Sequence, residues 1–526
     1  MLADVSKVRS TRGQSIPTPY AYPRESVATL FRKTAEARPD ATALRFRDQA
    51  VSYTALDRAS DHVAQQLFAL GHRSGDIVGI SMKRTPQLVA ALLGILKADG
   101  AYMPVDPAWP FSRLQVALRN SKARFLLSDT AEAPILPARI RTVTPDADLA
   151  DITRWPDMDS AALPPIAGAD DIAYVNFTSG SSGEPKGVMV PHRGITSLLF
   201  QANYTELSAE TVTLFHAPPY FDGMTFELWA PLLHGGTAVL FDSDYPNISR
   251  LRRTIRENNV NVLLCTAAIF NVIVDTAPDT FETLSTVMTG GEALSPRHVR
   301  AAAAAHANLR IVNVYGPTEA TTFSTFFDVS GLAPNSASVP IGVAVNNRSV
   351  FIAGPDLVPV PNGQVGEICV AGPGIALGYI GRPDLTAERF ALLTRPEGQL
   401  EPVYRTGDLG RYDAQGAIEF CGRNDNQIKL NGYRIELEEI ERCFVKHPDV
   451  LQALVVAHGE GARRALKALV VGSRIDSSSL RGFLSDSLPR HMLPSEFRVV
   501  AALPLKPNGK VDRIEAEAFF DGPSTD

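Results

Sequence analysis

Short runs of β-forming residues alternate along this chain with segments whose apolar residues recur at helical spacing. The spacing is clearest at Leu56, Val63, Leu67 and Leu70, which fall on one face of a helix. A run of alanines at 301–305 suits another helix. The strand-like runs lie at 77–82 (IVGISM), 125–129 (FLLSD), 171–175 (DIAYV), 261–265 (NVLLC) and 311–315 (IVNVY). This alternation predicts an α/β fold with largely parallel sheets.

The pattern changes near Phe351. Short strands separated by Gly/Pro turns (VFIAGP, GEICVAGPG, AIEFCGR) predict an antiparallel, barrel-like subdomain. After Arg423 a further unit follows, with two strands (LQALVVA, KALVVG) and a helix near Ser479. A chain of 526 residues is too long for one compact core. We therefore expect an N-terminal arm over 1–24, a large domain over 25–424 that contains parallel α/β sheets and a small β-barrel, and a small mobile α+β domain over 425–526.

Charge and composition narrow the class of protein. A net charge of −6 gives no electrostatic reason to expect a nucleic acid or an anionic membrane as partner. The N-terminus has no apolar segment typical of a secretory signal, and no apolar run is long enough to cross a bilayer. Cysteine occurs only at Cys265, Cys369, Cys421 and Cys443, without metal-ligand spacing. These features predict a cytoplasmic protein with reduced thiols, no nucleic-acid partner and no membrane partner.

The segment NFTSGSSGEPKGV at 176–188 is rich in glycine and hydroxyl side chains and has one lysine, Lys186. It does not match the GxxxxGK[ST] phosphate loop. Glycines nevertheless let successive backbone N–H groups face one anion, and serine and threonine hydroxyls add donors. The alternative is a solvated linker. A strand-like run before the segment and an apolar run (ITSLLF) after it favour a phosphate loop.

Eight other segments, before and after the glycine-rich segment, occur in the order that is typical of one enzyme superfamily. They are VSYTALD at 51–57, LKADGAYMPVDP at 96–107, FDGMTFELW at 221–229, NVYGPTE at 313–319, GEICVAGPGIALGY at 366–379, YRTGDLGR at 404–411, GRNDNQIKLNGYRIELEEIE at 422–441 and PLKPNGKVDR at 504–513. With TSGSSGEPKG, this set resembles the adenylate-forming superfamily over about residues 25–515. The motifs are most similar to the amino-acid-activating adenylation domains of nonribosomal peptide synthetases.

The resemblance implies an ATP- and Mg²⁺-dependent ligase. A substrate carboxylate attacks the α-phosphate of ATP, and the acyl group then passes to the phosphopantetheine thiol of a carrier protein. The resemblance assigns Lys510 as the catalytic residue, whereas the motif alone also fits a surface lysine in a turn. Asp425 would be the hinge of a mobile C-terminal domain, and Lys429 and Gly432 would line the pantetheine tunnel.

By the same resemblance, a set of residues is expected to bind ATP. The set is Thr178, Ser179, Gly180, Ser181, Ser182, Gly183, Lys186, Gly291, Glu292, Ala293, Asn313, Tyr315, Gly316, Thr318, Asp408, Phe420 and Arg423. Tyr315 would stack on adenine, although a core aromatic is the alternative, and Asp408 would accept hydrogen bonds from the ribose. Phe420 stands where a tyrosine would add a hydroxyl contact. Glu319 would bind Mg²⁺.

Asp222 decides the expected substrate class, because the resemblance pairs it with the ammonium group of an amino acid. Its alternative role is to cap the helix that follows. The other expected substrate-binding residues are Gly223, Phe226, Leu264, Met288, Gly290, Val314, Thr322 and Phe323. This set has no second charge, so we expect a hydrophobic side chain, branched aliphatic first and aromatic second. The amine position, α or β, stays open.

The sequence contains neither an HHxxxDG condensation motif nor an LGGxS-like carrier motif after Arg513. We therefore expect a freestanding enzyme that loads a separate carrier protein in trans. Two alternatives remain. An acyl- or aryl-CoA synthetase would use the same first half-reaction with free coenzyme A, and a pseudoenzyme would bind nucleotide without chemistry.

Overall fold

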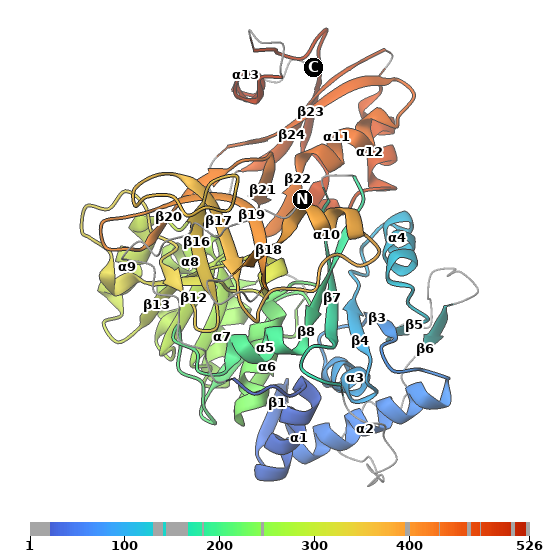
Figure 1. Ribbon diagram of the computed structural model, residues 1–526, viewed down its shortest axis with the longest axis vertical. Coiled ribbons are helices and arrows are strands. Elements are labelled where there is room, and N and C mark those ends of the chain that lie inside the picture. The colour runs from blue at the N-terminus through green and yellow to red at the C-terminus, as the bar shows by residue number, and fades with distance from the viewer. Residues whose placement is uncertain are drawn as a thin grey trace. The chain divides into compact units, whose positions relative to one another are not determined.

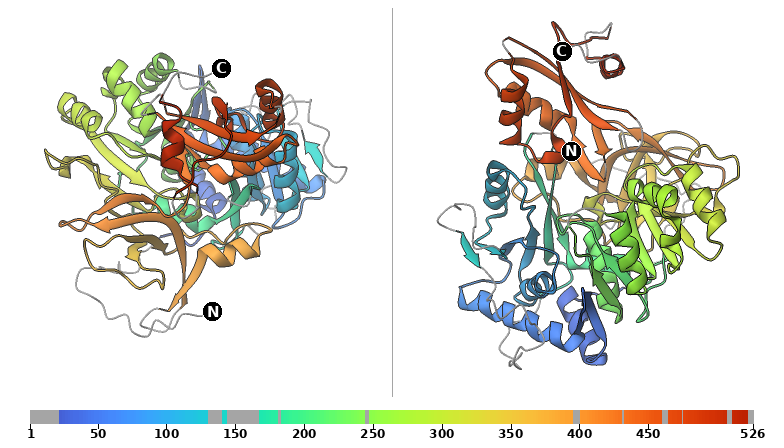
Figure 2. Two further views of the ribbon diagram at one scale, coloured as in Figure 1. Left: turned by 90° about the horizontal axis from the view of Figure 1, so that it is seen from above. Right: turned by 180° about the vertical axis from the view of Figure 1, so that it is seen from behind.

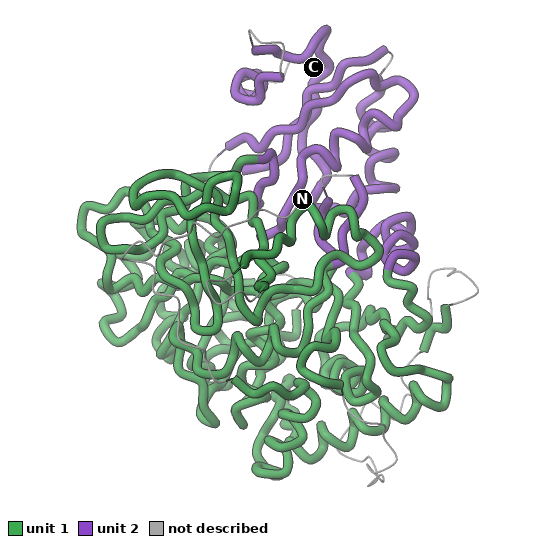
Figure 3. Tube along the Cα trace, in the orientation of Figure 1, with its two compact units in different colours: residues 1–105, 121–176, 188–424 green, residues 106–120, 177–187, 425–526 purple. Residues whose placement is uncertain are grey.

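The computed structural model describes residues 22–129, 140–143, 167–180, 183–243, 247–394, 400–430, 432–459, 464–473, 475–506 and 511–521. The chain forms two compact units (Figure 3). The first comprises Met1–Val105, Ser121–Asn176 and Val188–Asn424, and the second comprises Asp106–Asn120, Phe177–Gly187 and Asp425–Asp526. Two early segments thus group with the C-terminal residues. The domain bounds read from the sequence stay a prediction.

A nine-stranded sheet is the largest element of the first unit (Figure 1). Its order is β15 (Val343–Ala344), β14 (Thr325–Asp328), β13 (Arg310–Tyr315), β12 (Thr286–Gly290), β11 (Val262–Thr266), β9 (Val212–Phe215), β10 (Thr237–Leu240), β1 (Thr42–Phe46) and β2 (Gln49–Ser52). The inner pairs are parallel, while β2, β14 and β15 pair antiparallel at the edges. The predicted parallel α/β arrangement is confirmed.

A six-stranded sheet contains three more of the predicted strands. Its order is β6 (Arg141–Val143), β5 (Phe125–Ser128), β3 (Ile77–Ser81), β4 (Ala101–Pro104), β7 (Ile172–Thr178) and β8 (Lys186–Pro191). The pairs that join β3, β4, β5, β6 and β7 are parallel. The strand β7 leads directly into the glycine-rich segment, as the sequence predicts.

Helices cover both faces of the nine-stranded sheet. On one face a shared core contains α1 (Val27–Ala37), α2 (Tyr53–Ala69), α3 (Pro86–Lys97), α5 (His192–Leu199) and α6 (Gly223–His234). On the other face lie α7 (Ile248–Glu257), α8 (Ala267–Thr276) and α9 (Pro296–Ala305). In α2, Leu56, Val63 and Leu67 are buried as predicted, and Leu70 is the C-terminal cap. Figure 2 gives two further views of these layers.

The remaining strands of the first unit form a five-stranded antiparallel sheet. It consists of β16 (Ser349–Ala353), β17 (Gly366–Ala371), β18 (Phe390–Thr394), β19 (Leu400–Tyr412) and β20 (Ile418–Arg423). The long strand β19 pairs with β17, β18 and β20. The antiparallel arrangement predicted beyond Phe351 is confirmed. No helix among the described residues is long and apolar enough to cross a membrane.

The second unit combines α4 (Phe111–Ser121) with the C-terminal elements. These elements are β21 (Gln427–Leu430), β22 (Tyr433–Glu436), α11 (Leu437–Val445), β23 (Val450–His458), β24 (Ala465–Gly472), α12 (Ser477–Ser485), β25 (Glu496–Val499) and α13 (Arg513–Ala518). The strands β21 and β22 form a hairpin, and β23, β24 and β25 form a sheet with α11 and α12 in its core. The two strands and the helix predicted here are confirmed.

A buried ion cluster joins α2 to α3. The fully buried Lys97 ammonium donates to Asp57 Oδ1 at 2.6 Å and to Asp61 Oδ1 at 2.8 Å. Lys97→Ala removes the cation and leaves two carboxylates without it, so we expect a loss of about 3 kcal/mol in the free energy of unfolding. Lys33→Ala breaks the exposed pair with Glu25 and should cost less than about 1 kcal/mol. Urea denaturation measures both, and equal losses would contradict the prediction.

Candidate active site

The alternation of side chains along β11, β12 and β13 gathers four of the predicted substrate-binding residues on one face of the sheet. Leu264 pairs with Met288, and Gly290 pairs with Val314. Because side chains alternate between faces, Leu264, Met288, Gly290 and Val314 share one face. That face packs against α6, whose Phe226 belongs to the same core. Gly290 and Val314 lie at or next to the carboxyl ends of their parallel strands, where open α/β sheets bind ligands, and Leu264 and Met288 lie in the middle of theirs.

Aromatic side chains complete this apolar surface. Phe226 and Phe323 lie with ring centroids 5.8 Å apart, and Tyr204 lies 6.1 Å from Phe226 and 5.5 Å from Phe323. All three are buried. The Tyr204 hydroxyl donates to the carbonyl of Leu198 at 2.9 Å, so its polar end is satisfied. Tyr204 is absent from the residues chosen by sequence, because its segment matches no motif.

Asp222 immediately precedes α6, but its side chain does not cap the helix. No helix N–H donates to the carboxylate. Instead Asp222 Oδ2 accepts a hydrogen bond from Thr318 Oγ1 at 2.7 Å, and Thr322 Oγ1 donates to the Asp222 carbonyl at 3.1 Å. The capping alternative is therefore wrong. Thr318, expected among the ATP-binding residues, lies against the carboxylate expected to bind the substrate amine.

The opposite face of β13 belongs to a polar cluster. Tyr315 donates from its hydroxyl to Asp408 Oδ2 at 2.5 Å, and Arg423 Nη1 donates to Asp408 Oδ1. Burial, and next the adjacent Asp408 carboxylate, hold the pKa of Tyr315 well above its usual value. The half-exposed Phe420 ring lies 6.5 Å from Tyr315 between centroids. The structure thus brings together Tyr315, Asp408, Phe420 and Arg423, while Asn313 Nδ2 donates to Pro340 O at 2.7 Å.

The chain approaches itself closely around the ends of β12 and β13. A Cβ atom at Gly316 would lie 2.4 Å from the carbonyl oxygen of Thr322. Thr321 and Thr322 both have left-handed backbones, with φ of 54° and 67°. Such a conformation is costly for β-branched residues and is concentrated at functional sites. Gly291, Glu292 and Ala293 directly follow β12 and remain at least partly exposed.

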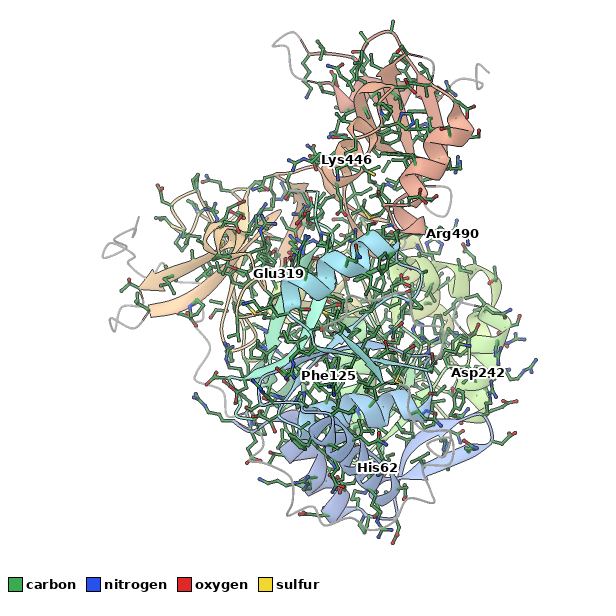
Figure 4. All side chains as sticks on the ribbon, turned by 90° about the vertical axis from the view of Figure 1, so that its right-hand side faces the viewer. His62, Phe125, Asp242, Glu319, Lys446 and Arg490 are labelled. Atoms are coloured by element: carbon green, nitrogen blue, oxygen red, sulfur yellow. The ribbon has the colours of Figure 1, made fainter. Side chains whose placement is uncertain are left out.

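Glu319, labelled in Figure 4, is fully buried and accepts a hydrogen bond from the Tyr379 hydroxyl at 2.7 Å. Its backbone carbonyl accepts from Ala376 N at 2.9 Å. No group of three or more His, Cys, Asp or Glu side chains that could bind a metal occurs within the described ranges. A single carboxylate nevertheless fits Mg²⁺ where substrate phosphates supply the other ligands. Tyr379 is a partner of Glu319 that the sequence analysis did not identify.

In the second unit the glycine-rich segment contacts residues 434–439. Ser179 Oγ donates to Arg434 O at 2.7 Å, and Gly180 N–H donates to Glu439 Oε2 at 3.1 Å. Lys186 Nζ lies 3.9 Å from Glu436 Oε1. The buried hydroxyl oxygen of Thr178 has no hydrogen-bond partner among the described residues. The segment is therefore a set of donors that attracts carboxylate oxygens.

The Glu439 carboxylate is held from a second side, because Arg113 Nη1 on α4 donates to its Oε1 at 2.5 Å. Both side chains are buried. Gly183 has a φ of +83°, in the region that favours glycine. Asp425 Oδ1 accepts from Gln427 N at 3.3 Å, Lys429 lies in β21, and Gly432 lies in the turn before β22. Ser181, Ser182 and Lys510 lie outside the described residues.

Two family models match the chain. The model of the AMP-binding enzyme matches residues 31–380, and that of the AMP-binding enzyme C-terminal domain matches residues 439–510. A linear gramicidin synthase polypeptide of Brevibacillus parabrevis is 39% identical over 498 residues, which are 94% of this chain and 6% of that protein. Surfactin synthase subunit 3 of Bacillus subtilis (strain 168) is 36% identical over 503 residues, 94% of this chain and 39% of that protein. The chain therefore spans less than half the length of these relatives.

Solved structures of nonribosomal peptide synthetase (NRPS) proteins with adenylation domains also match the chain. The holo form of an NRPS protein with adenylation and PCP domains, bound to a vinylsulfonamide inhibitor, matches with a TM-score of 0.85 and 32% identity over 94% of this chain and 84% of that one. An artificially fused adenylation–PCP di-domain NRPS from Klebsiella oxytoca matches with a TM-score of 0.83 and 28% identity, over 91% of this chain and 94% of that one. The predicted fold class is confirmed.

The fold and these matches define an adenylate-forming ligase. The chain belongs to the AMP-binding enzyme family, and the similarity of its motifs to nonribosomal peptide synthetase adenylation domains is confirmed.

Gly290 provides a test of the strand geometry at this site. A Cβ atom there would lie 2.0 Å from the backbone oxygen of Val314, so Gly290→Ala forces β12 and β13 apart. We expect a loss of about 3 kcal/mol or more in the free energy of unfolding. Gly291→Ala is the matched control, because its φ is +84° but a Cβ meets no atom within 4 Å, and it should cost only about 1–2 kcal/mol. The prediction is contradicted if urea denaturation ranks Gly291→Ala as the more damaging substitution.

Proposed function

We propose that the protein activates a hydrophobic amino acid as its aminoacyl adenylate and transfers it to the phosphopantetheine thiol of a carrier protein. One observation carries the amino-acid assignment. Asp222 lies directly before α6, next to the apolar surface. Its carboxylate makes no capping bond to the helix and accepts a hydrogen bond from Thr318. A charged group in this place suits a substrate with an ammonium group and an apolar side chain.

The first half-reaction needs no protein nucleophile. A carboxylate oxygen of the substrate forms a bond to the α-phosphorus of ATP as the bond from that phosphorus to the bridging oxygen of pyrophosphate breaks. The protein holds two anions together, neutralises the charge that develops, and excludes water. In this proposal Asp408 binds the ribose, Tyr315 stacks on adenine, and Lys510 bridges the carboxylate and the α-phosphate. Bound at Glu319, Mg²⁺ would supply positive charge to the phosphates.

The glycine-rich segment is assigned to the phosphate groups that leave as pyrophosphate. Support comes from the Thr178 hydroxyl, a buried group without a partner among the described residues. A buried donor of this kind needs an acceptor, which a phosphate oxygen provides. The contacts of Gly180 N–H and Lys186 with carboxylates also support this assignment, because carboxylate oxygens are acidic acceptors as phosphate oxygens are.

The amino-acid side chain is assigned to the surface formed by Phe226, Met288, Val314 and Phe323. These side chains are buried and apolar, so a substrate charge placed among them would have no partner. We infer a branched aliphatic side chain first and an aromatic one second, with an α- or β-amine. The carrier is assigned because similar solved structures contain PCP domains. In this proposal the accepting carrier lies outside the 526 residues, which hold no LGGxS-like motif.

The defining experiment is ATP–pyrophosphate exchange in the presence of paired α- and β-amino acids and their des-amino counterparts. We expect exchange with aliphatic amino acids and none above background with the des-amino acids. Lys510→Ala is the matched inactive control and should bind ATP without exchange. Exchange driven by the des-amino acids would instead identify an acyl-CoA synthetase, for which free coenzyme A is the acceptor.

Asp222 gives a sharper test of the substrate class. Asp222→Ala leaves the ammonium group unpaired, which costs roughly 3–5 kcal/mol and lowers kcat/KM for the amino acid by at least about a hundredfold. The KM for ATP should change much less, because Tyr315 and Asp408 lie in a separate hydrogen-bonded cluster, although the Asp222 carboxylate contacts Thr318. Steady-state exchange kinetics measure both constants. An unchanged KM for the amino acid would remove the ammonium assignment.

A further inference from the structure

The α6 helix carries a buried carboxyl group, that of Glu227, which is outside the set of expected site residues. Glu227 is 1% exposed, and its Oε2 accepts hydrogen bonds from the backbone N–H groups of His216 at 3.1 Å and Ala217 at 2.9 Å. These two residues begin the loop 216–222 that ends at Asp222. Glu227 therefore fixes the start of the loop, while Thr318 and Thr322 hold its end.

The same cluster reaches the neighbouring strand through His216. The imidazole Nε2 lies 2.7 Å from the carbonyl oxygen of Leu264 and 3.3 Å from Glu227 Oε1. A carbonyl oxygen only accepts hydrogen bonds. His216 Nε2 therefore carries the proton and donates a hydrogen bond to the Leu264 carbonyl. Burial lowers the pKa of His216 to about 4, which keeps the ring neutral near pH 7. The Glu227 carboxyl group and the His216 imidazole thus connect the loop 216–222 to β11.

Arg84 holds the loop from a third direction. Its guanidinium donates to the carbonyl of Ala217 at 3.0 Å and to that of Phe241 at 2.9 Å. Burial raises the pKa of Glu227 to about 8, against the two backbone N–H groups and Arg84, which lower it. The titratable groups that face Glu227 are Arg84, His216 and Cys265. Keeping an acid so deeply buried is costly, so a purely space-filling role would be met better by an apolar residue.

The position of Leu264 relative to the loop matters for the pocket. A Cβ atom built on Gly223 would lie 3.6 Å from Leu264 Cδ2 and 3.8 Å from the Ala217 side chain. Leu264 and Ala217 therefore flank Gly223, the residue after Asp222. A shift of either one changes the space beside the carboxylate assigned to the substrate amine.

We propose that Glu227 is a positioning residue for side-chain selectivity, because it fixes Ala217 directly and Leu264 through His216. This inference rests on the proposed function of the same pocket. Glu227 does not touch the substrate. Glu227 sets the distance between the loop 216–222 and β11. This distance determines the width of the proposed pocket beside the Asp222 carboxylate.

The test compares four variants with the wild-type protein in ATP–pyrophosphate exchange. Glu227→Leu removes the acceptor, Glu227→Gln keeps an oxygen for the two N–H groups, and His216→Phe removes the donor to Leu264. Thr213→Val is the matched control, because Thr213 Oγ1 donates at 2.6 Å to the backbone carbonyl of Glu227 and not to its side chain. The readout is the kcat/KM ratio for two amino acids that differ by one methylene, together with the KM for ATP.

We expect Glu227→Leu and His216→Phe to lower this ratio at least about tenfold, since one methylene is worth about 10–200-fold in a rigid apolar pocket. Glu227→Gln should keep the ratio within about threefold, Thr213→Val should leave it unchanged, and the KM for ATP should stay within about twofold throughout. His216→Phe decides the question if Glu227→Leu does not fold.

Two results would overturn the inference: a wild-type ratio in Glu227→Leu or His216→Phe, or an equal loss in Thr213→Val. Failure of the proposed function looks different. If the wild-type protein uses only des-amino acids, the amino-acid assignment fails, while the ratio for two des-amino acids that differ by one methylene still tests Glu227. Absence of exchange with every acid overturns both.

Discussion

The strict alternation of side chains along β12 and β13 is the constraint on which the rest of the site depends. Met288, Gly290 and Val314 face the apolar core under α6, whereas Asn313 and Tyr315 face the opposite side, where Asp408 and Arg423 lie. A slip of one residue would exchange the two faces completely. The surface assigned to the amino-acid side chain and the cluster assigned to the adenosine thus lie on opposite faces of β13. Gly290 lets β12 and β13 lie this close together, because only a hydrogen atom fits against the Val314 carbonyl.

Buried polar groups hold the elements around this sheet, and several of them join residues that lie far apart in the sequence. Asp222 is bonded to Thr318 and Thr322, Glu227 to the loop before it, and Glu319 to Tyr379. In a low-dielectric interior each such bond is strong and each loss is costly. The loop 216–222, which carries Asp222, is therefore fixed at both ends. In our proposal Glu227 affects selectivity through this loop, because moving one end of the loop changes the pocket beside Asp222.

Much of the fold follows from the sequence, because strand-like runs such as IVNVY and the helical spacing from Leu56 to Leu67 are local signals. The shared face of Leu264, Met288 and Val314 also follows from period two once the strands are aligned. Tyr204, Tyr379 and Glu439 could not be found in this way, since their roles arise from partners far along the chain. Asp222 shows a second limit: its place before α6 allows a capping role, but its carboxylate accepts a hydrogen bond from Thr318, which lies far along the chain, and makes no capping bond.

The donors of the glycine-rich segment have acidic partners within the chain. Gly180 N–H and Lys186 contact the carboxylates of Glu439 and Glu436, and Glu439 is also held by Arg113. A phosphate oxygen at the same N–H group cannot coexist with a carboxylate oxygen, because both are acceptors and both are negative. If the segment binds the phosphates of ATP as proposed, residues 434–439 must withdraw from it first. When pyrophosphate leaves, the donors of the segment can bind the carboxylates of Glu436 and Glu439 again. The segment thus exchanges one set of acidic oxygens for another. Its N–H groups are not left buried and unpaired.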